Sequence, residues 1–361
     1  MKPLLVGVLR DTRSALALDL GEWDLLLRQA ASADLLATLA RLLQDADLLA
    51  QVPAAPRAHL AWALTAAASH ARGARHEVSQ IAQALAELDL PLILLKGAAY
   101  AMAGIEAGRG RLFSDIDILV PKTRLDEVEA ALMLHGWASA HHDAYDQRYY
   151  REWMHELPPM MHVRRGNTID VHHAILPETA AVRPDPDKLR AAALPVVGQP
   201  GLFMLAPHDM FLHSAVHLFS GGEFEHGLRD LFDLHRLAGQ FGATPGFWQG
   251  LAPRAAELEL SRPLFYALRY LTRVFGTAVP AATLMAAEAG QPNALLMQLM
   301  DALFLRALCP PMPARLSRDD LAAVALFVLY VRGNWLRMPP VLLSRHLFHK
   351  AFISKKQETP V

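Results

Sequence analysis

The sequence predicts an α+β fold in which a small mixed β-sheet follows a helical segment and precedes a helical domain. Residues 1–75 are rich in Ala and Leu at helical spacing, whereas short apolar runs of strand length occur in residues 76–178. From about Pro177 the apolar residues again recur at helical intervals. We therefore divide the chain into residues 1–75, 76–178 and 179–352, followed by a flexible tail at 353–361.

The segment before the sheet is expected to be helical and shows no catalytic chemistry. Pro53 and Pro56 punctuate it. Apolar residues spaced three and four apart then predict a helix that leads into the first strand. These residues are Val78, Ile81, Leu85 and Leu88.

The first predicted strand is the apolar run Leu90–Leu95, which Lys96 and Gly97 bring to an end. The following residues, AAYAMAG, should be helical. Because glycine lacks a side chain, Gly97 is able to let the backbone approach a ligand closely.

The second predicted strand, Ser114–Leu119, carries two carboxylates on one face. Side chains alternate along a strand, so Asp115 and Asp117 emerge together while the isoleucines between and after them point into a core. The two carboxylates repel each other unless a cation lies between them or the face is solvated, and both interpretations are open. Hard oxygen ligands of this kind suit Mg²⁺ or Mn²⁺.

A β-hairpin is predicted further along, from Met160–Arg164 to Thr168–His173. Alternation places Asp170 and His172 on one face of its second strand. The preceding polar residues, 137–159, are expected to form a loop or irregular region.

In the helical domain, Pro207 suits the first turn of one helix and Gly221-Gly222 ends it. His213 and His217 lie four residues apart on that helix, and Arg229 and Asp233 repeat the spacing on the next. Two interpretations are open: these side chains form a wall facing a substrate, or they make helix–helix hydrogen bonds and i,i+4 ion pairs.

The composition excludes strong electrostatic attraction to a polyanion. Lys and Arg number 35 against 36 Asp and Glu, so nucleic acid is a possible partner but is not indicated by charge. The single cysteine, Cys309, is expected to be a small buried hydrophobe and fits a reducing cytosol. The longest apolar run, Leu321–Val331, is too short for a membrane span and is expected to be a helix buried in the bundle. We therefore expect a cytoplasmic protein.

The stretch Leu90–Val120 resembles the nucleotidyltransferase superfamily typified by DNA polymerase β. It is most similar to a poorly characterised bacterial nucleotidyltransferase family with a core of the form L-L-K-G…R…S-D-I-D-L-L-V. The residues that match are Leu94, Leu95, Lys96, Gly97, Arg111, Ser114, Asp115, Asp117, Leu119 and Val120.

The resemblance implies that residues 76–178 are a nucleotidyltransferase core. Such an enzyme transfers a nucleoside monophosphate from a nucleoside triphosphate to an acceptor and releases pyrophosphate, with two Mg²⁺ or Mn²⁺ ions. It implies Asp115, Asp117 and Asp170 as catalytic metal ligands, Asp170 lying in an Ile-Asp-Val-His element similar to that of the family.

The nucleotide-binding residues expected from the resemblance come from both parts of the chain. Lys96 replaces the Gly-Ser of polymerase-β-like enzymes and would supply a point charge to a phosphate. Arg111 would neutralise the triphosphate or pair with an aspartate, and His172 would touch substrate or stabilise Asp170. The other expected residues are Gly97, Ser114, His217, Arg229 and Asp233.

Two other functions are considered. The first is a catalytically inactive nucleotidyltransferase fold that binds or regulates. The second is a His-Asp metal phosphohydrolase using His208-Asp209, His213, His217 and Asp233, although Pro207 places the His-Asp pair in the first turn of a helix. The sequence does not define the acceptor, which is a small molecule, a protein or tRNA.

Overall fold

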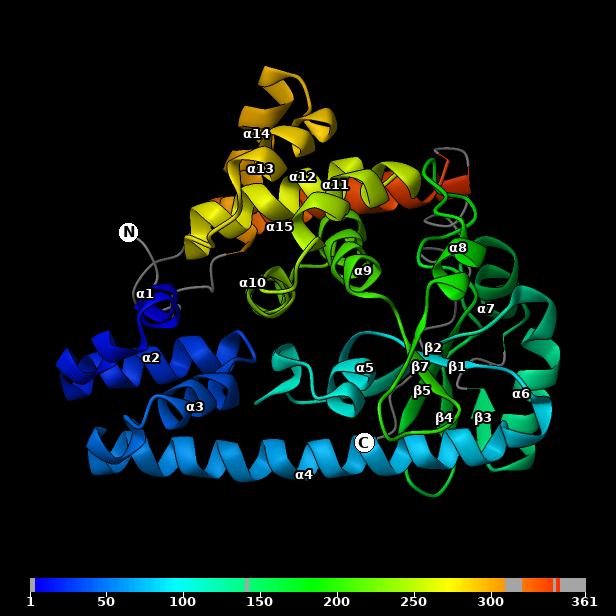
Figure 1. Cartoon of the computed structure of the whole chain (residues 1–361), viewed down its shortest axis with the longest axis horizontal. Helices are drawn as coiled ribbons and strands as arrows, with labels where there is room; N and C mark the ends of the chain where they lie inside the picture. Colours follow the sequence, from blue (N-terminus) through cyan, green and yellow to red (C-terminus); the bar gives the residue numbers. More distant parts are fainter. Residues whose placement is uncertain (1–3, 140–142, 309–319, 340–341, 345–361) are drawn as a thin grey trace.

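The computed structural model describes residues 4–139, 143–308, 320–339 and 342–344 of the chain (Figure 1). The predicted tail at 353–361 and Cys309 lie outside these residues. The structure confirms an α+β fold with helical N-terminal and C-terminal parts around one mixed sheet.

The strands are β1 (Leu92–Leu94), β2 (Asp115–Leu119), β3 (Trp137–Ser139), β4 (Met160–His162), β5 (Thr168–His172), β6 (Leu194–Pro195) and β7 (Leu202–Met204). The helices before and within the sheet are α1 (Leu4–Arg10), α2 (Leu20–Ser32), α3 (Leu36–Asp45), α4 (Ala54–Ala84), α5 (Lys96–Ala103), α6 (Leu125–Leu134), α7 (Ala144–Arg148) and α8 (Pro186–Ala191). The later helices are α9 (Pro207–Gly221), α10 (Gly227–Gly242), α11 (Phe247–Glu257), α12 (Ser261–Tyr270), α13 (Ala281–Ala287), α14 (Ala294–Ala307) and α15 (Asp320–Arg337).

The seven-stranded sheet has the order β3-β4-β5-β2-β1-β7-β6. β2 pairs parallel with β5 and antiparallel with β1, while β1 pairs parallel with β7. In the β2–β5 register, Asp117 lies opposite Asp170. Because paired residues on neighbouring strands share a face, this register brings the two aspartates together.

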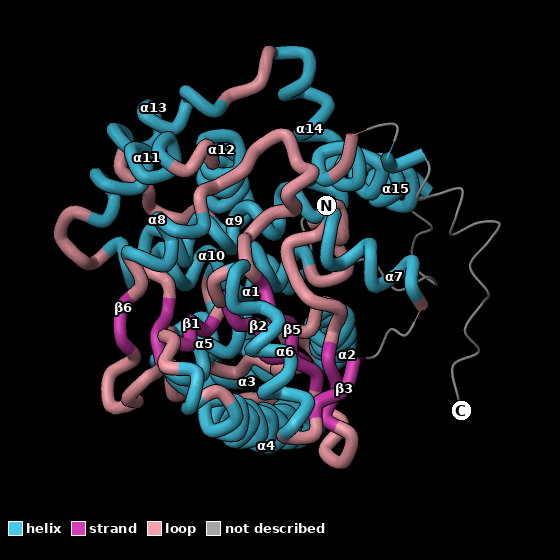
Figure 2. The backbone as a smooth tube through the Cα atoms, turned by 90° about the vertical axis from the view of Figure 1, so that its right-hand side faces the viewer, coloured by secondary structure: helices cyan, strands magenta, loops and turns pink. Residues whose placement is uncertain are grey.

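Helix α4 connects the N-terminal helices to the sheet. It is 31 residues long and runs along one side of the molecule, from α2 and α3 to a position beneath the strands (Figures 1 and 2). The boundary expected between residues 75 and 76 falls inside this helix. Its buried side chains include Val78 and Ile81, as the helical spacing before the first strand predicts.

The structure corrects two expectations about the chain around the hairpin. Residues 137–159, expected to be irregular, contain β3, α7 and a short π-helix, Tyr149–Trp153. Residues 179–206, expected to belong to a helical domain, contain the short helix α8 followed by β6 and β7, which extend the sheet. These strands are two and three residues long, so they carry too little alternation to be recognised.

The helices after residue 207 pack around an aromatic centre. Phe219 of α9 stacks on Tyr270, and Phe304 of α14 meets both rings edge-on. All three side chains are fully buried. One continuous apolar cluster joins this centre to the sheet and the N-terminal helices, from Leu5 to Leu329.

Helix α15 contradicts the expectation that the apolar run Leu321–Val331 is buried. Ala325 and Leu329 face the bundle, but Phe327 is 66% exposed and Trp335 is 60% exposed. A continuous apolar run has no periodicity that would reveal a half-exposed helix. In the part of the chain that is described, no helix combines the length and apolar character that crossing a membrane requires.

We predict that the contact between α4 and the hairpin is a major source of stability. Arg165 donates to the buried Glu77 carboxylate from Nε (2.6 Å) and Nη2 (3.1 Å), and lies over the Trp137 ring. The substitution Arg165→Ala leaves a buried carboxylate without its partner, so chemical denaturation should show a loss of about 3–5 kcal/mol in unfolding free energy. The exposed Arg148–Glu152 pair is the control, and Arg148→Ala should cost less than about 1 kcal/mol. Equal losses in the two variants would contradict this role.

Candidate active site

Three aspartates converge on one face of the sheet, as predicted. Asp115 and Asp117 come from β2 and Asp170 from β5. One carboxylate oxygen from each lies within 4.8 Å of the others, within the range expected for a shared metal site. Asp115 is exposed, Asp170 is partly buried and Asp117 is buried, so the cluster extends from the surface to the interior.

The ionisation of two aspartates is strongly perturbed, and in opposite directions. Burial and the neighbouring Asp117 charge raise the pKa of Asp170 to about 7. Burial also opposes ionisation of Asp117, but Lys96 and the hydrogen bond from His172 outweigh it and hold the pKa of Asp117 well below its usual range. The repulsion between clustered carboxylates therefore acts mainly on Asp170.

The donor set fits a hard divalent cation. Oδ1 of Asp170 is buried and makes no hydrogen bond within the described residues. The cations that approach Asp117 do so at Oδ1, which leaves Oδ2 for another partner. Three carboxylates that lie together in this way are suited to Mg²⁺ or Mn²⁺.

Lys96 points into the aspartate cluster from the end of β1. Its Nζ lies 3.5 Å from Oδ1 of Asp117. Burial lowers its pKa, but Asp117, Asp115 and Glu156 together outweigh burial and raise it. The backbone of Lys96 has φ +42°, a left-handed conformation that is unfavourable for a side-chain-bearing residue. Strained conformations of this kind concentrate at functional sites.

Gly97 and Ser114 occupy supporting positions. A Cβ at Gly97 would lie 3.1 Å from the Phe113 ring, so the glycine permits close packing against this side chain. The hydroxyl of Ser114 donates to Oδ1 of Asp115 at 2.7 Å. Both residues therefore position their neighbours in the site.

His172 lies between two carboxylates. Its Nε2 is 2.9 Å from Oδ1 of Asp117, and its Nδ1 is 3.1 Å from Oε2 of Glu156. Burial opposes the charged form, but the hydrogen bond to Asp117 and the Glu156 charge raise the pKa of His172. Its hydrogen-bond partner is Asp117, and not Asp170 as one of the two expected roles of His172 required.

The arginines expected to meet phosphates are paired with carboxylates. Arg111 forms an ion pair with Asp233 and lies over the Tyr100 ring. Arg229 pairs with Asp34 at 2.8 Å and with Asp230 at 3.0 Å. The i,i+4 ion pair between Arg229 and Asp233, one of the two interpretations of this spacing, is not formed: Asp233 pairs with Arg111, and Arg229 pairs with Asp34 and with the adjacent Asp230 of its own helix.

The histidines of α9 lie beside Lys96. Its charge, followed by burial, lowers the pKa of His217 to about 3, and burial with the same charge holds the pKa of His213 well below its usual range. Both rings are therefore neutral near pH 7. A narrow cavity of ≈ 30 Å³ joins this region to the arginine pairs, lined by Lys96, Tyr100, Arg111, Ser214, His217, Asp230 and Asp233.

A larger polar cavity opens beside Asp115. It has a volume of ≈ 410 Å³ and lies between α4 and the ends of β2 and β5. Glu77, Ser114 and Thr168 contribute to its lining. A more apolar cavity of ≈ 350 Å³ is lined by residues of α9, α12 and α15, and the three aspartates are not among them.

The alternative His-Asp site is not assembled. His208 interacts through Nε2 with the carbonyl oxygen of Phe247 at 2.8 Å and stacks on that ring. Asp209 is buried in a bidentate pair with Arg254, at 2.7 and 2.8 Å. The two residues thus connect α9 to α11, and neither belongs to a potential metal-ligand group among the described residues.

Several residues of this region were not predicted. Glu156 was assigned to a loop, and Asp230 follows Arg229 on α10 without any distinguishing spacing. Tyr100 contacts Ser214 at 2.7 Å through their hydroxyls and joins α5 to α9. A signal was available only for Glu156, which lies beside a histidine in the sequence Met-His-Glu-Leu.

The fold and the site together define the class of protein: a mixed sheet that presents a pair of aspartates on one strand and a third on its parallel neighbour. Residues 19–276 match the family described as "Uncharacterised nucleotidyltransferase". Because the match covers well over half of the chain, the protein belongs to that family. No curated protein matches the chain significantly. The same holds for solved structures.

We predict that Mg²⁺ binding weakens as the pH falls below about 7. In the metal-free protein Asp170 holds its proton up to a pH of about 7, and a metal ion must displace that proton. The apparent affinity should therefore fall by up to about tenfold per pH unit on the acid side of this value. Isothermal titration calorimetry from about pH 8 to about pH 5 measures it.

The exposed Asp126 offers a control, since Asp126→Asn should preserve this pH profile. Asp170→Asn should weaken binding and flatten the profile. An affinity that is constant across the range in the unsubstituted protein would contradict the assignment of Asp170.

Proposed function

We propose that the protein is a metal-dependent nucleotidyltransferase that moves a nucleoside monophosphate from a nucleoside triphosphate to an acceptor. One observation carries the proposal: Asp115, Asp117 and Asp170 gather their carboxylates within 4.8 Å on one sheet face, and Oδ1 of Asp170 is buried without a hydrogen-bond partner among the residues that the structure describes. Membership of a nucleotidyltransferase family supports it.

The reaction transfers the nucleoside monophosphate by substitution at its α-phosphorus. An acceptor O–H or N–H group bonds to the α-phosphorus through its oxygen or nitrogen and gives up its proton to solvent, while the bond from this phosphorus to the bridging oxygen of the β-phosphate breaks and pyrophosphate leaves with that electron pair. When bound, two Mg²⁺ or Mn²⁺ ions would neutralise charge on the attacking and leaving oxygens. Asp115, Asp117 and Asp170 would hold them. Because its lowered pKa keeps Asp117 ionised, this residue would bind a metal ion without first losing a proton.

Lys96 is the cation that we assign to the triphosphate. Its ammonium already faces the aspartates, and a point charge at that position stabilises phosphate oxygens. Arg111 and Arg229 act differently, because each is held by carboxylates of the helical domain or the N-terminal helices. We assign them to positioning the wall that includes His217 and Asp233.

The cavity beside Asp115 is a suitable place for a substrate. Its volume of ≈ 410 Å³ lies within the range of ligand pockets, roughly 300–1,000 Å³. Thr168 contributes a hydroxyl group to its lining, whereas the Ser114 hydroxyl there donates to Asp115 and the Glu77 carboxylate is held by Arg165. The acceptor class is left open between a small molecule, a protein and tRNA.

Replacing single carboxylates should abolish catalysis while preserving the fold. We expect Asp115→Asn, Asp117→Asn and Asp170→Asn each to reduce Mg²⁺-dependent pyrophosphate release by roughly 10²-fold or more, the scale of losing one principal electrostatic stabiliser. The swap nearly conserves volume, so circular dichroism should be unchanged. Pyrophosphate release with each nucleoside triphosphate, and with a cell lysate as acceptor source, is the measurement.

Asp126→Asn, a swap of the same chemistry on the exposed side of α6, should retain full activity. Nucleotide binding without pyrophosphate release under every acceptor condition would instead indicate a binding protein. Full activity in the three site variants would show that the carboxylates are only a solvated strand face.

Lys96 offers a second test, because two substitutions separate its charge from its backbone conformation. Lys96→Ala and Lys96→Gly both remove the ammonium, whereas only glycine accepts φ +42° without strain. We expect both variants to raise KM for the triphosphate, with a smaller effect on kcat if the contact is equally strong in the ground state and the transition state. A defect in Lys96→Ala that Lys96→Gly repairs would show that backbone geometry, rather than charge, matters.

A further inference from the structure

We propose that His155, Glu156 and His172 form a second metal site, separate from the three aspartates, which takes one borderline divalent ion of the Zn²⁺ type. One ligand atom from each of the three residues lies within 4.8 Å of the others. The proposal is independent of nucleotidyl transfer, since it concerns a different donor set and a different class of ion.

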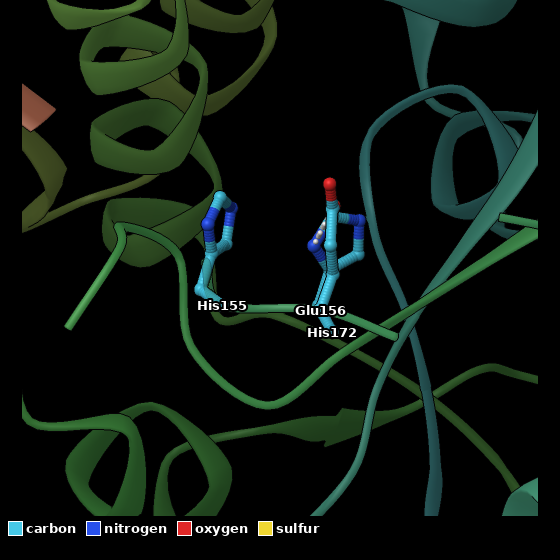
Figure 3. Close-up of side chains that lie close together, drawn as sticks. All are labelled: His155, Glu156 and His172. Atoms are coloured by element: carbon cyan, nitrogen blue, oxygen red, sulfur yellow. Dashed lines mark ion pairs between the residues drawn. The ribbon is translucent and has the colours of Figure 1, made fainter. Parts of the chain in front are cut away.

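The ligand atoms of the three side chains lie close together. Figure 3 shows them pointing in the same direction, with Glu156 close to His172 and a ring nitrogen of His155 turned toward both. Oε2 of Glu156 is 3.1 Å from Nδ1 of His172. The two imidazole rings are 5.2 Å apart between centroids and tilted by 32°, so they do not form a parallel ring stack.

Backbone pairing holds the ligands in place. Glu156 forms an antiparallel bridge with His172 at the end of β5. On either side, the amide of Leu157 donates to the carbonyl of Val171 at 2.9 Å, and that of His173 donates to the carbonyl of His155 at 2.8 Å. Ligands fixed on a hydrogen-bonded sheet lose little freedom on binding an ion, so the site is preorganised.

The surroundings of His172 match those of a metal-bound imidazole. Its Nε2 lies 2.9 Å from Oδ1 of Asp117, so an N–H at Nε2 donates to that carboxylate. This tautomer leaves the lone pair of Nδ1 directed at Glu156. A carboxylate that orients a histidine from the far side of the ring is the usual support of a metal-binding histidine.

The donor set selects a different ion from the aspartate cluster. Two imidazole nitrogens and one carboxylate oxygen are a common ligand set of Zn²⁺, with a fourth position open to water or substrate. Three carboxylates suit Mg²⁺ or Mn²⁺ instead. In addition, Nδ1 of His155 is buried without a hydrogen bond in the described part of the chain, so this ring is not engaged in a structural contact through that atom.

The competing explanation is a proton in place of the metal ion. A doubly protonated His172 would donate to both Asp117 and Glu156 and satisfy the same two distances. This explanation gives His155 no role. Metal binding that requires both His155 and Glu156 therefore separates the two.

The experiment measures Zn²⁺ binding by the full chain in excess Mg²⁺, which occupies the aspartate cluster. We expect one bound Zn²⁺ per chain, and Co²⁺ in its place should give the strong absorption of a low-symmetry site with nitrogen ligands. Glu156→Gln and His155→Ala should each weaken Zn²⁺ by at least the roughly 10- to 100-fold that losing a supporting residue costs. Asp115→Asn should leave it unchanged.

His59→Ala and Glu225→Gln are matched controls, because both side chains are exposed and neither belongs to the proposed Zn²⁺ site or to the aspartate cluster. The proposal is overturned if the unsubstituted protein binds no Zn²⁺ in excess Mg²⁺. It is also overturned if Glu156→Gln and His155→Ala weaken Zn²⁺ binding no more than the two controls do. Binding that Asp115→Asn abolishes and Glu156→Gln retains would also overturn it. Should a cluster variant not fold, the Co²⁺ spectrum of the unsubstituted chain decides, since a weak octahedral spectrum excludes the site.

Discussion

Repulsion among carboxylates on one face of the sheet is the constraint on which this site depends. The parallel register of β2 and β5 sets Asp117 opposite Asp170, and the cluster also includes Asp115. The protein offsets this repulsion unevenly. Lys96 and His172 both approach Oδ1 of Asp117 and keep it ionised, whereas the pKa of Asp170 rises to about 7. A cation bound between the aspartates would offset the remaining repulsion among their carboxylates.

The position of Lys96 explains much of the helical wall opposite the sheet. Its charge lies in a largely enclosed region, so the neighbouring histidines of α9 are held neutral. Each arginine there forms an ion pair with a carboxylate: Arg111 with Asp233, and Arg229 with Asp34 and Asp230. Because Asp34 follows α2, the last of these pairs also ties the N-terminal helices to α10. The helical segments thus serve the site by fixing its charges.

The central strands were predicted from local signals, whereas the grouping of Asp170 with Asp115 and Asp117 was implied by the resemblance to the family. Alternation along Ser114–Leu119 and Thr168–His173 fixes which side chains share a face, and a parallel or antiparallel neighbour preserves that face. The pairing of strands that lie far apart in the sequence had no such local signal. The pairing of β7 with β1 follows from the edge that β1 offers after β2 has paired on its other side.

The ion-pair partners of the charged residues could not be predicted from the sequence either. Arg229 and Asp233 have the spacing of an i,i+4 pair, yet each finds a carboxylate or guanidinium on another element. Burial decides this, since a buried charge needs the nearest good partner in three dimensions. The half-exposed α15 shows the reverse difficulty: a continuous apolar run predicts a helix but does not say which face is covered.

The hydrogen bond between His172 and Asp117 joins the two donor sets of the site. Asp117 serves the aspartate cluster and, through Oδ1, orients the ring whose other nitrogen faces Glu156. A charge placed on one side of this ring affects the group on the other side, because the two sides are connected by one buried hydrogen bond of 2.9 Å. A cation beside Glu156 would make Nε2–H a stronger donor and draw electron density from Asp117. The occupancy of one donor set would therefore alter the basicity of the other through a single shared carboxylate.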